Sequence, residues 1–80
     1  MNQEEIIRDF YGRIIGRIFT KPNGDKEARD FYGRMLGTWD KNLDVTRDFY
    51  GRIVARGNML SGLIWEEENK NHNVDISKKK

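Results

Sequence analysis

The chain contains no cysteine, one proline and a single histidine. The lack of cysteine excludes disulfides and thiolate metal sites, and His72 alone cannot form a multi-histidine metal site. There is no long apolar run, so we expect neither a signal peptide nor a membrane span. Eighty residues allow one small domain, whose core is marginal at this size. These absences favour a cytoplasmic protein without a cofactor.

A strong charge of one sign is also lacking. The chain has 15 lysines and arginines against 13 aspartates and glutamates, a formal net charge of +2. Three of the lysines are the last residues, Lys78, Lys79 and Lys80, and without them the rest of the chain is slightly negative. The net charge therefore gives no indication of a polyanionic partner.

The sequence does contain an internal repeat. Arg-Asp-Phe-Tyr-Gly-Arg occurs at residues 8–13, 29–34 and 47–52. Successive copies are 21 and 18 residues apart, which is too short for most helical-pair repeats and suits two strands joined by tight turns. The repeat predicts a mainly all-β fold, an antiparallel meander of three β-hairpin repeats with about six strands.

Each copy has the residues of a hairpin turn. The aspartate can begin a type I turn, and the glycine can take the left-handed position of a G1 bulge. In the first copy, the resulting three-residue loop pairs Asp9 with Arg13. In the third copy, the same register pairs Thr46 with Val54.

The connections between hairpins are predicted from their turn residues. Asn23-Gly24 is the strongest short signal for a two-residue type I′ turn, which would pair Phe19 with Ala28. The second connection contains Asp40-Lys41-Asn42-Leu43, and the sequence leaves its length open. Within it, Asn42 tolerates the left-handed region.

Alternation along the strands places apolar residues on both faces of the sheet. Gly16, Gly37 and Ala55 hold the same repeat position, where a small residue leaves room for an aromatic ring. One face collects Ile6, Ile14, Gly16, Ile18, Met35, Gly37, Trp39, Val45, Ile53 and Ala55, and the other carries Ile7, Ile15, Ala28, Leu36, Thr46 and Val54. Both faces therefore need a cover.

The phenylalanines of the repeat are the expected occupants of the small-residue column. We expect Phe10, Phe31 and Phe49 to fold back onto it and serve as core. The alternative is that these rings are exposed at the turns, where they could stack on nucleic-acid bases.

Residues Asn58–Glu68 predict a short helix, because Asn58 can cap it and the following apolar residues fall on one side. A final strand over Gly62–Glu67 is the alternative. One short helix covers only part of one face, so we expect a homo-oligomer, such as a dimer, to cover the rest. Residues 1–68 would form the domain, and residues 69–80 a disordered polar and basic tail.

The pattern Asp-x-x-Gly-Arg followed by an apolar residue resembles the YD (RHS-type) repeat. In that family a tyrosine precedes the aspartate, and successive copies build β-hairpins in long shells. Here Arg8, Arg29 and Arg47 replace that tyrosine. The resemblance implies hairpins but no shell, for which three copies are too few. The chain also looks like small hypothetical hairpin-repeat proteins of Gram-positive bacteria and their phages, which implies the host cytoplasm.

The charged residues of the repeat do not predict catalysis. Each repeat aspartate lies near two arginines, which stabilise a carboxylate, whereas a general acid needs a raised pKa. No serine–histidine or cysteine–histidine arrangement is present to build a nucleophile. We therefore expect no catalytic or metal-binding residue, and no enzyme.

The repeat favours a non-enzymatic protein–protein interaction module. Four positions of each copy have an expected structural role in the turn or the core: the aspartate, the phenylalanine, the glycine and the second arginine. The first arginine and the tyrosine are left to bind a protein partner of unknown identity. In a phage or mobile-element setting, such a protein would bind and inhibit a host complex, as an anti-CRISPR protein does. The predicted partner-binding residues are Arg8, Tyr11, Arg29, Tyr32, Arg47 and Tyr50.

Two alternative functions stay open. One is a small nucleic-acid-binding module that uses the arginines and tyrosines of the repeats. Adjacent aspartates cancel part of the arginine charge, which a phosphate-binding surface would avoid. The other is a structural protein whose sheet assembles with itself.

Overall fold

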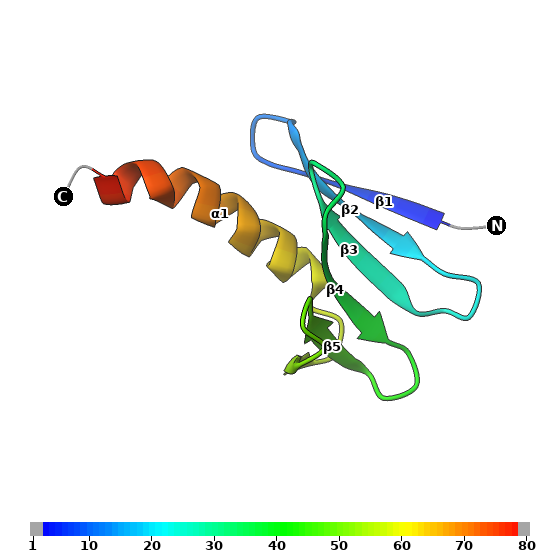
Figure 1. Ribbon diagram of the computed structural model, residues 1–80. Coiled ribbons are helices and arrows are strands. Elements are labelled where there is room, and N and C mark those ends of the chain that lie inside the picture. Colours follow the sequence, from blue (N-terminus) through cyan, green and yellow to red (C-terminus); the bar gives the residue numbers. More distant parts are fainter. Residues whose placement is uncertain (1–2, 79–80) are drawn as a thin grey trace.

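The structure is a computed structural model that describes residues 3–78, with side chains described for residues 3–70. Within this range, six strands and one helix follow each other along the chain (Figure 1). They are β1 (Gln3–Arg8), β2 (Ile14–Thr20), β3 (Lys26–Asp30), β4 (Met35–Asp40), β5 (Val45–Asp48), β6 (Ile53–Arg56) and α1 (Leu60–Lys78). The strands form one antiparallel sheet in sequence order, which confirms the predicted meander.

The repeat forms the predicted turn in all three copies. In the first copy, the N–H of Asp9 donates to the Arg13 carbonyl at 2.9 Å, and the N–H of Gly12 donates to the Asp9 carbonyl at 3.1 Å. The glycines have positive φ angles of 82°, 87° and 85° at Gly12, Gly33 and Gly51. Each glycine therefore provides the left-handed residue of a three-residue loop.

Beyond the turn, each hairpin contains a one-residue irregularity. In the third hairpin Thr46 pairs with Ala55, so the expected pair with Val54 is wrong. The same shift leaves Ile15 out of the register in the first hairpin and Leu36 in the second. An extra residue in one strand moves the side chains that follow to the other face. Beyond each irregularity, the side chains of that strand therefore lie on the face opposite to the one that strict alternation predicts.

The connection between β2 and β3 also differs from the prediction. Gly24, with a φ of 96°, ends a loop of three residues, 22–24, whereas the Asn-Gly pair predicts two. The proline suits the second position of a type I turn, so the turn takes in one residue more. Ala28 consequently pairs with Ile18 instead of Phe19.

The connection between β4 and β5 is closed by Asp40. Its Oδ1 accepts hydrogen bonds from the N–H groups of Asn42 at 2.9 Å and Leu43 at 3.1 Å. The residue with positive φ is Asp44, at 54°, and not Asn42. The N–H of Asp44 donates to the Asp40 carbonyl at 2.8 Å, which sets the loop length that the sequence leaves open.

These register changes gather the apolar residues on one side of the sheet. Ile18 and Ala28, which alternation assigns to opposite faces, are cross-strand partners in one buried cluster. Apolar side chains from both predicted faces therefore share a single core under α1. The cluster contains Ile15, Ile18, Ala28, Leu60 and Ile64, with Ile7, Leu36, Trp39, Leu63 and Trp65 packed against it.

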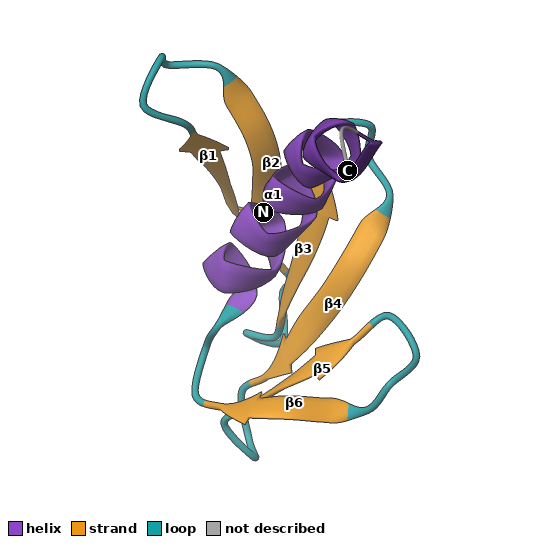
Figure 2. Ribbon diagram, turned by 90° about the vertical axis from the view of Figure 1, so that its left-hand side faces the viewer, coloured by secondary structure: helices purple, strands orange, loops and turns teal. Residues whose placement is uncertain are grey.

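Helix α1 crosses β2, β3 and β4 (Figure 2). Its start is the predicted one, because Asn58 Oδ1 accepts a hydrogen bond from the N–H of Leu60 at 3.1 Å. The helix continues to Lys78, beyond the expected end at Glu68. Disorder of residues 69–80 stays a prediction, and the side chain of His72 lies outside those described.

Two members of the small-residue column, Gly16 and Gly37, lie under this helix. A Cβ atom on Gly16 would be 2.6 Å from Ile64 Cγ2, and one on Gly37 would be 2.5 Å from Leu63 Cδ1. The two glycines thus make room for aliphatic side chains of α1, so the expectation of aromatic rings is wrong at these two positions.

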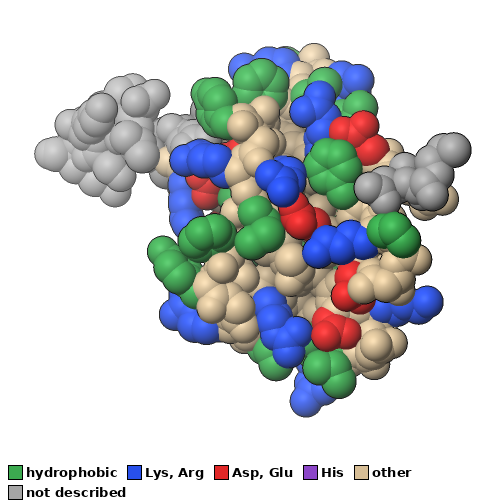
Figure 3. Space-filling model, turned by 45° about the vertical axis from the view of Figure 1, so that its right-hand side comes forward, with side chains coloured by type: hydrophobic (Ala, Val, Ile, Leu, Met, Phe, Trp, Pro, Cys, Tyr) green, Lys and Arg blue, Asp and Glu red, His purple; other side chains and the backbone are tan. Residues whose placement is uncertain are grey.

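Ion pairs link β1 to β2 and the β2–β3 loop to β3. Arg17 Nε lies 3.0 Å from Glu4 Oε2, and Lys21 Nζ lies 3.7 Å from Glu27 Oε1. Over the face seen in Figure 3, acidic and basic side chains are interleaved with scattered hydrophobic ones. These pairs are partly exposed, so each contributes little to stability.

Candidate functional site

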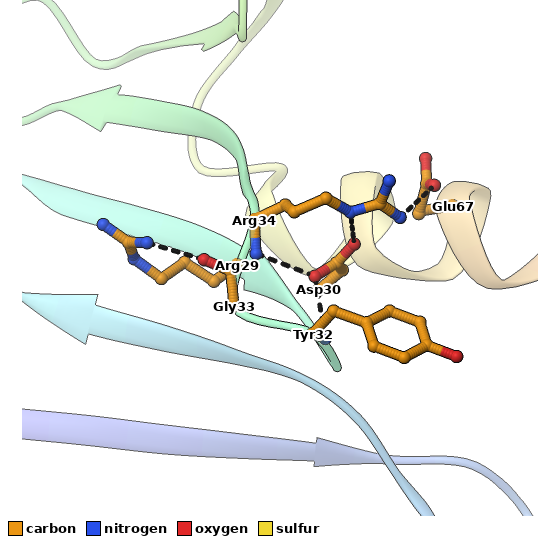
Figure 4. A network of polar contacts seen from close by, with 6 residues as sticks. All are labelled: Arg29, Asp30, Tyr32, Gly33, Arg34 and Glu67. Carbon is orange, nitrogen blue, oxygen red and sulfur yellow. Dashed lines mark hydrogen bonds and ion pairs between the residues drawn. The ribbon is translucent and has the colours of Figure 1, made fainter.

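The three repeat turns, residues 9–13, 30–34 and 48–52, are called the hairpin tips. In the second tip, Asp30 Oδ1 accepts hydrogen bonds from the N–H groups of Tyr32 and Arg34, both at 2.9 Å. Its Oδ2 accepts one from Arg34 Nε at 2.7 Å (Figure 4). One carboxylate therefore fixes both the backbone of the loop and the following arginine.

The first and third tips repeat this arrangement. Asp9 Oδ2 lies 2.8 Å from Arg13 Nε, and Asp48 Oδ2 lies 3.0 Å from Arg52 Nε. The backbone hydrogen bonds to Oδ1 in these tips are 2.9 and 3.0 Å long. The repeated sequence thus builds the same rigid turn three times.

The charge state of the aspartates follows from these bonds. Burial alone would raise the pKa of the Asp9 and Asp48 carboxyls, but the hydrogen bonds and positive charges of Arg13 and Arg52 hold both pKa values below their usual range. In the second tip, the hydrogen bond to the aspartate raises the pKa of Arg34. Asp9 and Asp48 are therefore ionised groups that stabilise their turns.

The first arginines of the repeats bind within the protein. Arg29 Nη1 donates to the Gly33 carbonyl at 2.6 Å, and Figure 4 shows its side chain on the far side of the turn from the carboxylate. Arg8 Nη1 makes the same bond, at 2.8 Å, in the first tip. Arg47 departs from this rule, because its Nη1 lies 3.4 Å from Asp40 Oδ2. These three predicted site residues therefore support the turns and the sheet.

The aromatic residues are exposed. The expectation that the phenylalanines serve as core is wrong, because all three are exposed. At Gly16 and Gly37, the space for a ring is taken by Ile64 and Leu63 of α1. Phenylalanine and tyrosine therefore both point outward at every tip. The exposed fractions are 97% for Phe10, 56% for Phe31, 59% for Phe49, 85% for Tyr11, 74% for Tyr32 and 77% for Tyr50.

Each tyrosine is held against the second arginine of its repeat. The guanidinium carbon of Arg52 lies 5.3 Å from the ring centroid of Tyr50, and the other two tips have distances of 5.7 and 5.8 Å. Since the same arginine is bound to the tip aspartate, the ring packs on a fixed cation. The predicted tyrosines thus keep a large exposed surface in a defined position.

Helix α1 passes between the hairpin tips, which lie at one end of the sheet (Figure 2). The rings of Phe10 and Trp65 have centroids 6.3 Å apart, and Arg34 Nη2 lies 3.4 Å from Glu67 Oε2. Trp65 and Glu67 belong to this surface, although no sequence pattern predicts them there. Their position depends on where the helix crosses the sheet, which no local pattern indicates.

An open groove lies between α1 and the third tip. Its volume is about 1010 Å³. Phe49, Val54, Met59, Leu63 and Trp65 contribute apolar surface to its walls. The helix packs on the central strands and leaves this side of the third hairpin uncovered, so the groove extends the exposed apolar surface of the tips.

Within the described residues, no group of acidic or histidine side chains is placed to hold a metal ion, and no helix is long and apolar enough to cross a bilayer. The resemblance to YD (RHS-type) repeats and to phage proteins stays a prediction. Comparison of the chain with protein-family models, with curated proteins and with solved structures gives no match.

Proposed function

We propose that this chain is a non-enzymatic protein-binding module whose hairpin tips contact a protein partner. The observation that carries the proposal is the exposure of an aromatic pair at each tip, with no tip phenylalanine or tyrosine less than 56% exposed. Tyrosine and arginine dominate binding hot spots, because they bury a large area and can also form hydrogen bonds.

The rigidity of the tips supports the same proposal. In each tip, a carboxylate binds two backbone N–H groups and the arginine that packs on the tyrosine, for example Asp48, Arg52 and Tyr50. Side chains that are fixed before binding lose less conformational entropy when a partner binds. The groove beside the third tip adds a concave apolar surface for a partner side chain.

A nucleic-acid partner is less well supported. The second arginine of every tip has Nε within 3.0 Å of an aspartate, so a negative charge lies next to each of these three cations, which weakens their attraction for a phosphate. The proposal includes the phage or mobile-element setting, in which the partner would be a host protein complex that the chain inhibits.

The experiment compares capture of host proteins by three forms of the intact chain. The wild type is immobilised beside the triple variant Tyr11→Ser, Tyr32→Ser and Tyr50→Ser, and beside Leu43→Ser. Leu43 is 60% exposed in the β4–β5 loop, at the opposite end of the sheet from the tips, and serves as the matched control.

We expect a protein that the wild type and Leu43→Ser retain and the triple variant loses, while all three forms melt at similar temperatures. Retention by the triple variant at wild-type strength would exclude the tips as the contact surface. Capture of nucleic acid alone, released by moderate salt, would favour the other class of partner.

A further inference from the structure

The hairpins are joined to each other by one repeated register. Gly16 of β2 pairs with Asp30 of β3, and Gly37 of β4 pairs with Asp48 of β5. In both interfaces, the small residue that follows one tip lies opposite the aspartate of the next tip. The chain therefore contains two examples of how one hairpin adds to another.

At each edge of the sheet, the position that would join a further hairpin has no partner within the described residues. Ala55 of β6 holds the position of the two glycines, and Asp9 holds the position of the aspartates at the end of β1. Strands β1 and β6 are the edges of the sheet, so within the described chain neither position has a following or preceding hairpin. The β6 edge therefore presents the small residue, and the β1 edge presents the aspartate, of the pair that joins two hairpins within the chain.

Equivalent residues differ in exposure between the edges and the interior of the sheet. Phe10 is 97% exposed, whereas Phe31 and Phe49, which each have a preceding hairpin beside them, are 56% and 59% exposed. At the other edge Ile53 is 57% exposed, whereas its equivalent Ile14 is half-buried. Each end of the sheet thus exposes apolar surface that is better covered inside the array.

We propose that a second copy of the chain adds its β1 to the free edge of β6, in the register that joins the hairpins within one chain. Ala55 would then lie opposite Asp9 of the second copy, and Phe10 of that copy would pack beside Ile53. The open backbone groups of an edge strand favour such an addition. The contact joins two different surfaces, so copies associate head to tail.

The side chains are compatible with this register. It places Arg56 opposite Arg8 of the second copy, and the chain already tolerates such a pair, since Arg17 lies opposite Arg29 between β2 and β3. Arg8 would keep its bond to the Gly12 carbonyl, as Arg29 keeps its bond to Gly33. The contact therefore needs no change in the tips.

The contact is short, which limits its strength. Strand β6 ends at Arg56, and Gly57 leaves the sheet with a φ of 80° and an N–H that donates to the Asp44 carbonyl at 2.6 Å. Association should therefore depend on concentration and produce a mixture of short head-to-tail oligomers.

Light scattering with size-exclusion chromatography, from micromolar to millimolar protein, tests the proposal. We expect the mass of the wild type to rise with concentration, while Ile53→Lys and Phe10→Ser each stay monomeric. Mixing these two variants should restore a dimer and nothing larger, because one supplies an intact β1 edge and the other an intact β6 edge. Leu43→Lys is the matched control and should associate like the wild type.

Three results would overturn the proposal. They are a wild type that is monomeric at every concentration, edge variants that associate like the wild type, and a mixture of folded variants that stays monomeric. A dimer that each variant still forms alone would instead assign a symmetric interface elsewhere. Thermal melting of each variant checks that it is folded, and Ile53→Thr replaces Ile53→Lys if the lysine lowers the melting temperature. The outcome is independent of whether the tips bind a protein partner.

Discussion

A Cβ atom on Gly16 would lie 2.6 Å from Ile64 Cγ2 and 2.7 Å from the Arg29 carbonyl oxygen. Strand β2 and helix α1 therefore touch without a sheet side chain between them. The Ile64 side chain is fully buried, so this contact forms the centre of the core.

The substitution Gly16→Ala should therefore destabilise the protein. The carbonyl of Arg29 belongs to the neighbouring strand and cannot move away as a side chain could, so we expect a loss of about 1–3 kcal/mol in the free energy of unfolding. Urea unfolding followed by circular dichroism measures it. A variant as stable as the wild type would show that α1 does not pack on this strand.

At Gly62, in helix α1, we expect substitution by alanine to stabilise the protein. The Cβ of an alanine at Gly62 would be 3.9 Å from Met59 Cε, an ordinary contact distance. Since glycine lowers helix stability relative to alanine, Gly62→Ala should raise the free energy of unfolding by about 0.5–1 kcal/mol. The same urea experiment checks it, and a loss of stability would indicate that another part of the molecule packs closely on this position.

The turn glycines depend on backbone conformation alone. Gly33 has a φ of 87°, and apart from its own backbone and its two chain neighbours nothing lies within 4 Å of the position that its Cβ would take. Gly33→Val should therefore cost at least about 1 kcal/mol, because a β-branched residue is strained in the left-handed region. Gly33→Asn is the matched control and should cost less, since asparagine tolerates that region. Equal melting temperatures for wild type and the valine variant would contradict the assigned turn.

The tips were predictable because their signal is local. An aspartate, a glycine three residues on and the arginine after it specify the turn, so the meander of hairpins follows from the spacing of the copies. The register beyond the tips was not predictable, because a residue such as Leu36 has no feature that marks it as the extra one. The exposure of the phenylalanines depends in turn on Leu63 and Ile64, which reach the sheet from a distant part of the sequence.

Thr46 connects the third hairpin to the helix. Its side chain is fully buried, and its Oγ1 donates to the Gly57 carbonyl at 2.6 Å and accepts from the N–H of Met59 at 2.9 Å. Thr46→Val keeps the shape but leaves both backbone groups without this partner, so we expect a loss of about 1–3 kcal/mol. Thr38→Val, in β4, is the control and should change stability by less than about 0.5 kcal/mol. Similar stabilities of the two variants would show that the junction does not depend on this hydroxyl.

The stability of the protein should fall in acid because of its turn aspartates. At Asp40, the hydrogen bond from the N–H of Leu43 is the largest influence on the carboxyl, whose pKa is held below its usual value of 3.8. The pKa values of Asp9 and Asp48 are lowered as well. A carboxyl whose pKa is lower in the folded chain than in the unfolded chain stabilises the fold fully above the unfolded value. That stabilisation is lost as the pH falls through the lower, folded values.

Melting temperatures between pH 6 and pH 2 check this prediction. We expect a plateau at the upper end of this range and a decline that begins near the unfolded pKa of 3.8. The triple variant Asp9→Asn, Asp40→Asn and Asp48→Asn should show a lower plateau and a shallower decline, because asparagine can still accept the backbone hydrogen bonds but has no charge to lose. An equally steep decline in the variant would assign the acid sensitivity to other carboxyl groups.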